Sequence, residues 1–393
     1  MTQPAVPYVR LSGFYFFYFS LLGVIVPFWS LYLADKGFTP EVLGALVAMV
    51  HLSRIVAPNI WGWLADKTGE RVKIIRWGSF LTCVLFSLIF WQEGALGIAL
   101  VTLAFSFFWN AVLPQFELVT LNNLGKAQAN YSRIRLWGSI GFVVAVLGVG
   151  ALLDVMPIRY LPFVMLGLML LIWLNALWVS EPKQGDEGAT TESQPIWQTL
   201  KRPEVVVFFL VCFLNQFAHG GYYTFYSVLM EDTGYSRTQI GLLWSLGVVA
   251  EILLFIVMPH IIKRASYTLI MAASLALAAV RWWVIGFMPD HFVLLLLGQL
   301  AHAATFGAMH VAGIALVQVY FKPKQQGQGQ ALFSSLGFGL GGALGAFAAG
   351  YLWLWGGESL TFGVSALASL LALVLLFVVT QRSKMPVKNE ESG

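Results

Sequence analysis

The stretch GWLADKTGERVK, from Gly62 to Lys73, places two glycines and five charged residues between two long apolar runs. Glycine permits a tight turn, and the carboxylate of Asp66 can accept hydrogen bonds from a neighbouring helix N-terminus or from an arginine. The stretch therefore predicts a short, charged turn between two helices, which can hold one face of the molecule together in one conformational state.

Apolar runs recur from Val9 to the end of the chain, and each has about the 20 residues that a membrane-spanning helix needs. We predict an all-α membrane protein with twelve transmembrane helices. The first run is too long for the core of a signal peptide, so we expect it to be retained as the first helix. The predicted spans are 9–33, 41–64, 74–92, 95–119, 134–153, 158–179, 204–229, 238–262, 267–288, 291–320, 328–354 and 358–380.

The composition also indicates a lipid environment. Of the 393 residues, 58% are hydrophobic and 11% are charged, whereas soluble domains have roughly 45–50% and about 25%. Basic residues in such a chain first serve to orient it in the bilayer, so the net charge of +4 predicts no nucleic-acid partner. Cys83 and Cys212 lie within apolar runs and fit neither a disulfide framework nor a metal site, so we expect inert thiols and no metal or cofactor.

The chain divides into two halves that resemble each other. The longest polar break, Ser180 to Pro203, is rich in glycine, serine, threonine, proline and charge, as flexible linkers are. We therefore predict a six-helix bundle over 1–180, a linker over 181–203 and a second six-helix bundle with a short tail over 204–393. A shift of 197 residues aligns Gly23, Phe28, Ser30, Asp35, Gly37, Gly44 and Leu46 with Gly220, Phe225, Ser227, Asp232, Gly234, Gly241 and Leu243. Such repeats are typical of transporters whose halves rock about a site near the bilayer midplane.

The distribution of Lys and Arg predicts the orientation. If the N-terminus is cytoplasmic, 18 of the 23 basic residues lie on the cytoplasmic side. Lys36, Arg159 and Arg237 then lie outside, and Arg54 and Arg281 lie within helices. Because cytoplasmic loops carry the excess of positive charge, we expect both termini and the linker in the cytoplasm.

Several motifs indicate a family. The charged turn resembles the loop signature of the major facilitator superfamily, G-x-L-x-D-[RK]-x-G-x-[RK], through Gly62, Leu64, Asp66, Lys67, Gly69 and Arg71. Further motifs resemble those of the 3-phenylpropionic acid transporter family, which is related to lactose permease and the nucleoside–proton symporters: PFWS (27–30), RLWGS (135–139), LLWSLGVVAE (242–251), VRW (280–282) and the set His302, Thr305, Phe306 and His310. The resemblance spans nearly the whole chain. It implies a bacterial inner-membrane transporter, expected as a monomer, that couples uptake of an aromatic carboxylate to protons.

Ionisable side chains within the membrane are costly, so each is a candidate functional residue. Apolar neighbours penalise the charged form of Glu251, so we predict that Glu251 carries the coupled proton; a permanent salt bridge between helices is the alternative. Arg281 cannot lose its proton and needs a carboxylate partner, either Glu251 or the substrate. In lactose permease, coupling likewise involves an acid in the eighth helix, an arginine in the ninth and ionisable residues in the tenth. His302 and His310 are the corresponding candidates here, although neutral histidines that join helices are the alternative.

Arg54 occupies the position that the 197-residue shift maps onto Glu251. Its guanidinium can bind a substrate carboxylate through two hydrogen bonds, whereas an arginine that snorkels or pairs helices is the alternative. We expect Glu117 to pair with Arg133 or Arg135 near the cytoplasmic surface, in a gating or structural role. We assign the same kind of role to the turn residues Gly62, Asp66, Lys67, Gly69 and Arg71.

Seven side chains of the first, fourth and seventh helices are candidate walls of a substrate cavity, because they combine flat apolar surfaces with polar edges. For any one of them, packing between helices or against lipid is the alternative. The set comprises Tyr15, Tyr18, Trp109, Asn110, Tyr222, Tyr223 and Tyr226.

Other classes of function fit the sequence less well. The HExxH and GxSxG motifs of metalloproteases and hydrolases do not occur, so we expect no enzyme. A channel would not explain the repeat of two halves. A proton-coupled sugar or nucleoside symporter and a substrate-sensing receptor with a transporter fold are the alternatives to an organic-anion transporter.

Overall fold

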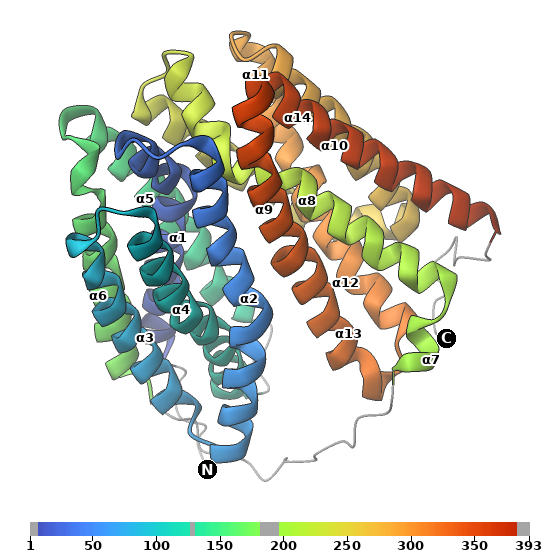
Figure 1. The fold of residues 1–393 in the computed structure, drawn as a ribbon. Coiled ribbons are helices and arrows are strands. Elements are labelled where there is room, and N and C mark those ends of the chain that lie inside the picture. Colours follow the sequence, from blue (N-terminus) through green and yellow to red (C-terminus); the bar gives the residue numbers. More distant parts are fainter. Residues whose placement is uncertain (1–6, 126–129, 181–195, 383–393) are drawn as a thin grey trace. The chain divides into compact units, whose positions relative to one another are not determined.

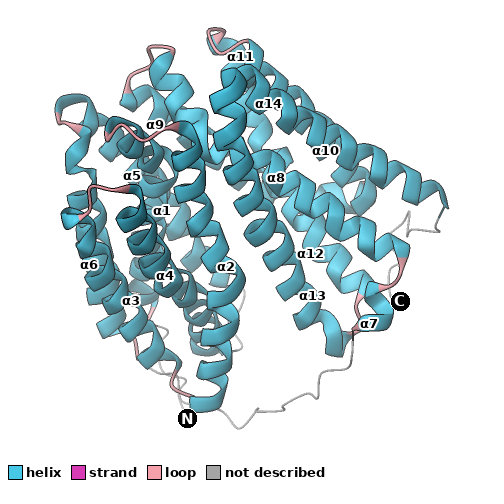
Figure 2. Ribbon diagram, viewed as in Figure 1, coloured by secondary structure: helices cyan, strands magenta, loops and turns pink. Residues whose placement is uncertain are grey.

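The computed structural model describes residues 7–125, 130–180 and 196–382. Within these ranges the chain is helical, with short 3-10 and π turns and no strand (Figure 2). Most of the predicted linker, 181–195, and the end of the predicted tail, 383–393, lie outside the described residues.

The helices follow the predicted spans closely. The first half of the chain contains α1 (Tyr8–Asp35), α2 (Pro40–Thr68), α3 (Arg71–Ser87), η1 (Leu88–Trp91), α4 (Ala95–Leu124), α5 (Tyr131–Val155), η3 (Ile158–Tyr160) and α6 (Leu161–Trp178). The second half contains α7 (Trp197–Leu200), α8 (Pro203–Asp232), α9 (Arg237–Arg264), α10 (Tyr267–Phe287), α11 (Phe292–His302), η4 (Ala303–Ala308), α12 (Met309–Tyr320), η5 (Pro323–Gln325), α13 (Gln326–Leu332), η6 (Phe333–Gly341) and α14 (Gly342–Arg382).

Eleven segments of the described chain are long and apolar enough to cross a membrane. The last, Pro323–Thr380, has 58 residues, whereas one crossing needs about 20. Its backbone leaves the helical conformation at Gly356 and Gly357, and the φ of Gly357 is +61°, which glycine adopts easily because it has no Cβ. The segment therefore supplies two crossings, which confirms the prediction of twelve.

Two of the crossings in the second half are interrupted by π turns. The turn η4 separates α11 from α12, and η6 separates α13 from α14. A π turn adds one residue to the helical repeat, and such turns are frequent at functional sites.

Contacts divide the described chain into two compact units. Unit 1 takes the described residues of Met1–Phe38, Leu52–Gly188 and Ser236–Leu242, and unit 2 takes those of Thr39–His51, Ala189–Tyr235 and Leu243–Gly393. In unit 1, α1 packs against α5 and α6, and α3 packs against α4 and α6 (Figure 1). In unit 2, α8 packs against α14 and η6, and α10 packs against α14, α11, η4 and α12.

Aligned glycines of the repeat make equivalent close approaches in the two units. A Cβ atom on Gly23 of α1 would lie 2.7 Å from the carbonyl oxygen of Phe142 on α5. A Cβ atom on Gly220 of α8 would lie 2.2 Å from the carbonyl carbon of Gly345 on α14. Only glycine fits at both positions, so the sequence repeat corresponds to a repeat in helix packing.

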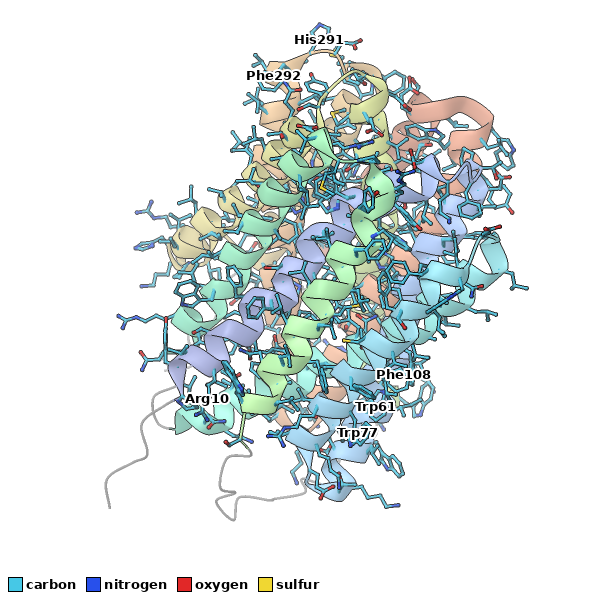
Figure 3. All side chains as sticks on the ribbon, turned by 90° about the vertical axis from the view of Figure 1, so that its left-hand side faces the viewer. Arg10, Trp61, Trp77, Phe108, His291 and Phe292 are labelled. Atoms are coloured by element: carbon cyan, nitrogen blue, oxygen red, sulfur yellow. The ribbon has the colours of Figure 1, made fainter. Side chains whose placement is uncertain are left out.

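Aromatic and basic side chains lie at one end of unit 1 (Figure 3). Arg10 donates a hydrogen bond to the carbonyl oxygen of Trp178 at 3.1 Å, where α6 ends. The ring centres of Trp61 and Phe108 are 5.5 Å apart, and Trp77 is 56% exposed. Tryptophan at such positions is typical of the membrane–water interface.

Candidate functional site

A buried arginine organises the polar residues of unit 2. Arg281 lies on α10 and is 2% exposed. Its Nη1 atom donates to Nδ1 of His302 and to Oγ1 of Thr305, both at 3.1 Å. The guanidinium carbon lies 4.3 Å from the centre of the Tyr222 ring and 4.5 Å from that of Trp282. These ring faces stabilise the buried cation.

The bond from Arg281 fixes the protonation of His302. A guanidinium has donors only, so Nδ1 of His302 accepts with its lone pair and carries no proton there. Thr305 lies on the π turn η4, three residues after His302, and its hydroxyl also contacts the carbonyl oxygen of His302 at 3.4 Å. A proton can therefore reach Nδ1 only when the Arg281 bond opens.

Two nitrogen atoms of Arg281, Nε and Nη2, have no hydrogen-bond partner among the described residues. The described part of the chain also places no carboxylate in an ion pair with this guanidinium. A buried charge without an ion partner is unusual in proteins.

Aromatic side chains surround this arginine. Tyr222 donates to Oε1 of Gln299 at 2.8 Å, and the indole of Trp244 donates to Ser227 at 2.9 Å. The ring of Tyr222 lies 4.5 Å from Trp244 and 4.9 Å from Tyr226, centre to centre. Two of the predicted wall residues, Tyr222 and Tyr226, are thus fully buried beside the cation, whereas the third, Tyr223, is half-buried and stacks on Trp244.

Glu251 and Arg281 both contact the π turn η4. Glu251 is half-buried on α9, and its Cγ atom would lie 3.0 Å from a Cβ atom on Gly307. Arg281 reaches the same turn through Thr305. One short segment therefore contacts both of the charged residues predicted to take part in coupling.

A second arginine site lies in unit 1. Arg54, on α2, is half-buried, and its Nε atom donates to Oδ1 of Asn110 at 3.4 Å. Asn110 in turn donates to Ser53 at 2.7 Å. Beside it, the rings of Tyr18 and Trp109 stack at 5.2 Å, and Arg54 is close enough to Tyr18 to interact electrostatically. The structure thus brings together four residues predicted for substrate binding.

Glu117 lies beside Tyr131 in the same unit. Tyr131 and Arg135 are both close enough to interact with its carboxylate. The Arg135 guanidinium carbon lies 3.8 Å from the centre of the Phe19 ring, whereas Arg133 is exposed. The predicted wall residue Tyr15 is fully buried in this region, and its hydroxyl contacts Thr120 at 3.4 Å.

The charged turn between α2 and α3 has the expected local geometry. Gly69 has a φ of +70°, and Asp66 forms an ion pair with Arg71. Arg71 also donates to Oε1 of Gln115 on α4 at 2.6 Å, and Lys67 lies 5.0 Å from the ring centre of Trp63. The acid therefore accepts from an arginine, which is one of the two partners proposed for it from the sequence.

Three residues around Tyr222 and His302 have no role predicted from the sequence: Gln299, Trp244 and His219. Trp244 belongs to the LWSLGVVAE string, so a signal for it was present. His219 is fully buried, with ring centres 4.8 Å from Trp282 and 6.3 Å from His302. No local pattern distinguishes Gln299 from other polar residues in apolar helices.

Comparisons with known proteins agree with this architecture. The model of the MFS_1 like family matches residues 8–364. A probable 3-phenylpropionic acid transporter of Escherichia coli (strain K12) is 29% identical over 371 residues, which are 92% of this chain and 95% of that protein. A maltose permease of Geobacillus stearothermophilus is 24% identical, over 92% of this chain and 93% of its own. The crystal structure of the nucleoside transporter NupG matches with a TM-score of 0.83 at 18% identity, over 95% of this chain and 99% of that chain.

Proposed function

We propose that this chain, which belongs to the MFS_1 like family, is a proton-coupled symporter of a small organic anion. An aromatic carboxylate is the leading substrate class. Membership confirms the predicted major facilitator fold and the class of function. The chain is a multi-pass transporter of the bacterial inner membrane and not an enzyme.

The observation that carries the substrate class is the arrangement around Arg54. A planar guanidinium can bind both oxygens of a carboxylate. The stacked rings of Tyr18 and Trp109 beside it are buried, and their flat faces would suit an aromatic ring once the two rings separate. Unlike Arg281, Arg54 is only half-buried, so a ligand needs less rearrangement to reach it. The name of the Escherichia coli relative, a phenylpropionic acid transporter, supports the same class.

The proton-coupling part of the proposal rests on Arg281, His302 and Glu251. Nδ1 of His302 can take a proton only after Arg281 releases it, so protonation and the position of the arginine are linked. Glu251 contacts the same π turn, and we assign the coupled proton to it. Movement of η4 would then change the surroundings of the acid and of the arginine together.

We extend the proposal to the organisation of the chain. Two six-helix bundles, 1–180 and 204–393, are joined by a cytoplasmic linker and move relative to each other in a monomer, with both termini in the cytoplasm. The excess of basic residues in the predicted cytoplasmic loops supports this orientation. A reporter fused after Thr380 should read as cytoplasmic, and an extracellular signal would overturn the topology.

The test is a panel of labelled solutes offered to proteoliposomes with an inwardly directed proton gradient. We expect 3-phenylpropionate to accumulate faster than in protein-free liposomes and its amide to stay at equilibrium. Accumulation of maltose or a nucleoside in its place would favour a sugar or nucleoside symporter, for which the relatives named above are the models. Saturable binding without accumulation of any solute would favour a receptor.

A further inference from the structure

A small, mostly apolar cavity of unit 2 is lined in part by polar residues that the proposed function does not use. It lies between α8, α12 and η6, and its lining includes Cys212, Asn215, Gln216, His310, Phe333 and Phe338. The cavity exists partly because Gly337 of η6 has no side chain. A Cβ atom on Gly337 would have its nearest neighbours at 3.8 Å, so a methyl group fits there without a clash.

Two polar atoms at this cavity lack partners. Asn215 is 1% exposed, and its Oδ1 atom accepts no hydrogen bond from any described residue. Nδ1 of His310 is likewise buried without a partner in the described chain. Buried polar atoms are normally satisfied by protein or by ordered water. A water molecule is small enough for this space and can donate to the amide oxygen while it bonds the imidazole.

His310 is separated from the Arg281 cluster by an aromatic ring. Phe306 stacks between the two histidines, with ring centres 5.3 Å from His302 and 6.4 Å from His310 and planes within 10° of parallel to each. A phenyl ring carries no exchangeable proton. The stacked ring of Phe306 therefore offers no route for a proton between His302 and His310 in this conformation.

The surroundings of His310 contain few other titratable groups. Cys212 of α8 faces the cavity, and Phe306 separates His310 from His302 and His219. Glu251 lies against Gly307, three residues before His310. No charged side chain of the described chain lines the cavity. An imidazolium at position 310 would therefore depend on water for its stabilisation.

We propose that this cavity is a water site that bridges Asn215 and His310, and that its water exchanges protons with the His310 imidazole. The proton leaves a hydronium ion, whose O–H bond breaks as the ring-nitrogen lone pair forms the N–H bond of the imidazolium. On release the N–H bond breaks and a water molecule takes the proton back. The role in coupling rests on the proposed function, whereas the water site itself does not. His310 is then the point at which protons reach unit 2 from water.

The water site can be tested without transport. Full-length protein with ¹⁵N-labelled histidine in lipid bilayers is measured by water-edited solid-state NMR, and the His310 signal is identified by its loss in His310→Gln. We expect transfer from water to His310 in the wild type and its loss in Gly337→Ala, which fills part of the cavity. Gly148→Ala is the control, because a Cβ atom there has no neighbour within 4 Å. Absence of transfer in the wild type, or equal transfer in Gly337→Ala, would overturn the proposal.

A second variant tests the role in coupling. Asn215→Leu keeps approximate size but removes the acceptor of the water. We expect loss of gradient-driven accumulation, while exchange of labelled for unlabelled substrate at equal pH persists and shows that the variant is folded. Accumulation equal to the wild type would overturn this role. If the wild type accumulates no carboxylate at all, the proposed function fails, and the NMR result alone decides the water site.

Discussion

Nη1 of Arg281 donates to Nδ1 of His302 over 3.1 Å, inside a shell of aromatic rings and with the arginine 2% exposed. The bond excludes a proton from Nδ1 of His302, because two donors cannot share one hydrogen bond. This relationship links the position of the permanent Arg281 cation to the protonation of the His302 ring.

Replacing His302 with Gln should keep an acceptor for Arg281, through the amide oxygen, but remove the titratable group. We expect a flatter pH dependence of transport than in the wild type. Substrate affinity should change by less than about tenfold, because one bond to a charged group is retained. Initial uptake rates measured from pH 5 to 8 check this. A pH profile identical to that of the wild type would assign His302 a structural role only.

Replacing Arg54 with Lys should weaken carboxylate binding. Lysine keeps the charge but loses the planar pair of donors and the bond to Asn110. We expect the affinity for the carboxylate to fall about tenfold. This loss corresponds to about 1.4 kcal/mol, close to the contribution of one charge-assisted hydrogen bond. Titration calorimetry with 3-phenylpropionate measures it, and the amide analogue is the control. Equal losses for the acid and the amide would indicate that Arg54 only holds helices together.

Replacing Glu251 with Gln mimics the protonated acid permanently. We expect binding and exchange of substrate across the membrane to survive, whereas accumulation driven by a pH gradient is lost, because the empty carrier cannot release a proton. Both rates can be measured in the same proteoliposomes. Accumulation at a near-normal rate would remove Glu251 as the proton carrier and return the assignment to His302, His310 or Glu117.

Replacing Gly307 with Ala tests the π turn. The added methyl group would lie 3.0 Å from Cγ of Glu251, so the acid must move by a few tenths of an ångström. We expect the pH profile of uptake to shift while the protein stays folded. Gly167→Ala is the matched control, because nothing lies within 4 Å of a Cβ atom there. The same profile for both variants would show that the position of Glu251 does not govern coupling.

The sequence predicted the parts of the molecule that depend on short-range chemistry. Hydrophobic length alone located the crossings. The glycine and charge pattern between the second and third runs predicted a tight turn and an acceptor role for Asp66, and the structure has a positive φ at Gly69 and an ion pair between Asp66 and Arg71. The repeat matched Gly23 to Gly220, and these two glycines make equivalent close approaches in the structure. Each of these follows from residue types at fixed spacing.

The environment of the candidate site could not be predicted in this way. A π turn such as η4 differs from an α-helix by one residue in its hydrogen bonding, and packing against α9 and α10 decides which forms. The burial of the α8 tyrosines could not be predicted either. Tyr222 and Tyr226 are fully buried, whereas the adjacent Tyr223 is half-buried. The partners of Arg281 lie 21 and 24 residues away, and ionisable residues alone did not reveal the role of Thr305.

Coupled transport means that substrate and protons cross the membrane together. This is tested most directly in proteoliposomes that contain a pH-sensitive dye and start with equal pH on both sides, to which 3-phenylpropionate is added outside. Because the uncharged acid also crosses lipid unaided, protein-free and Glu251→Gln vesicles are measured in parallel. We expect internal acidification that is faster than in both controls and parallel to uptake of the labelled acid. Uptake with acidification no faster than in the controls would contradict it.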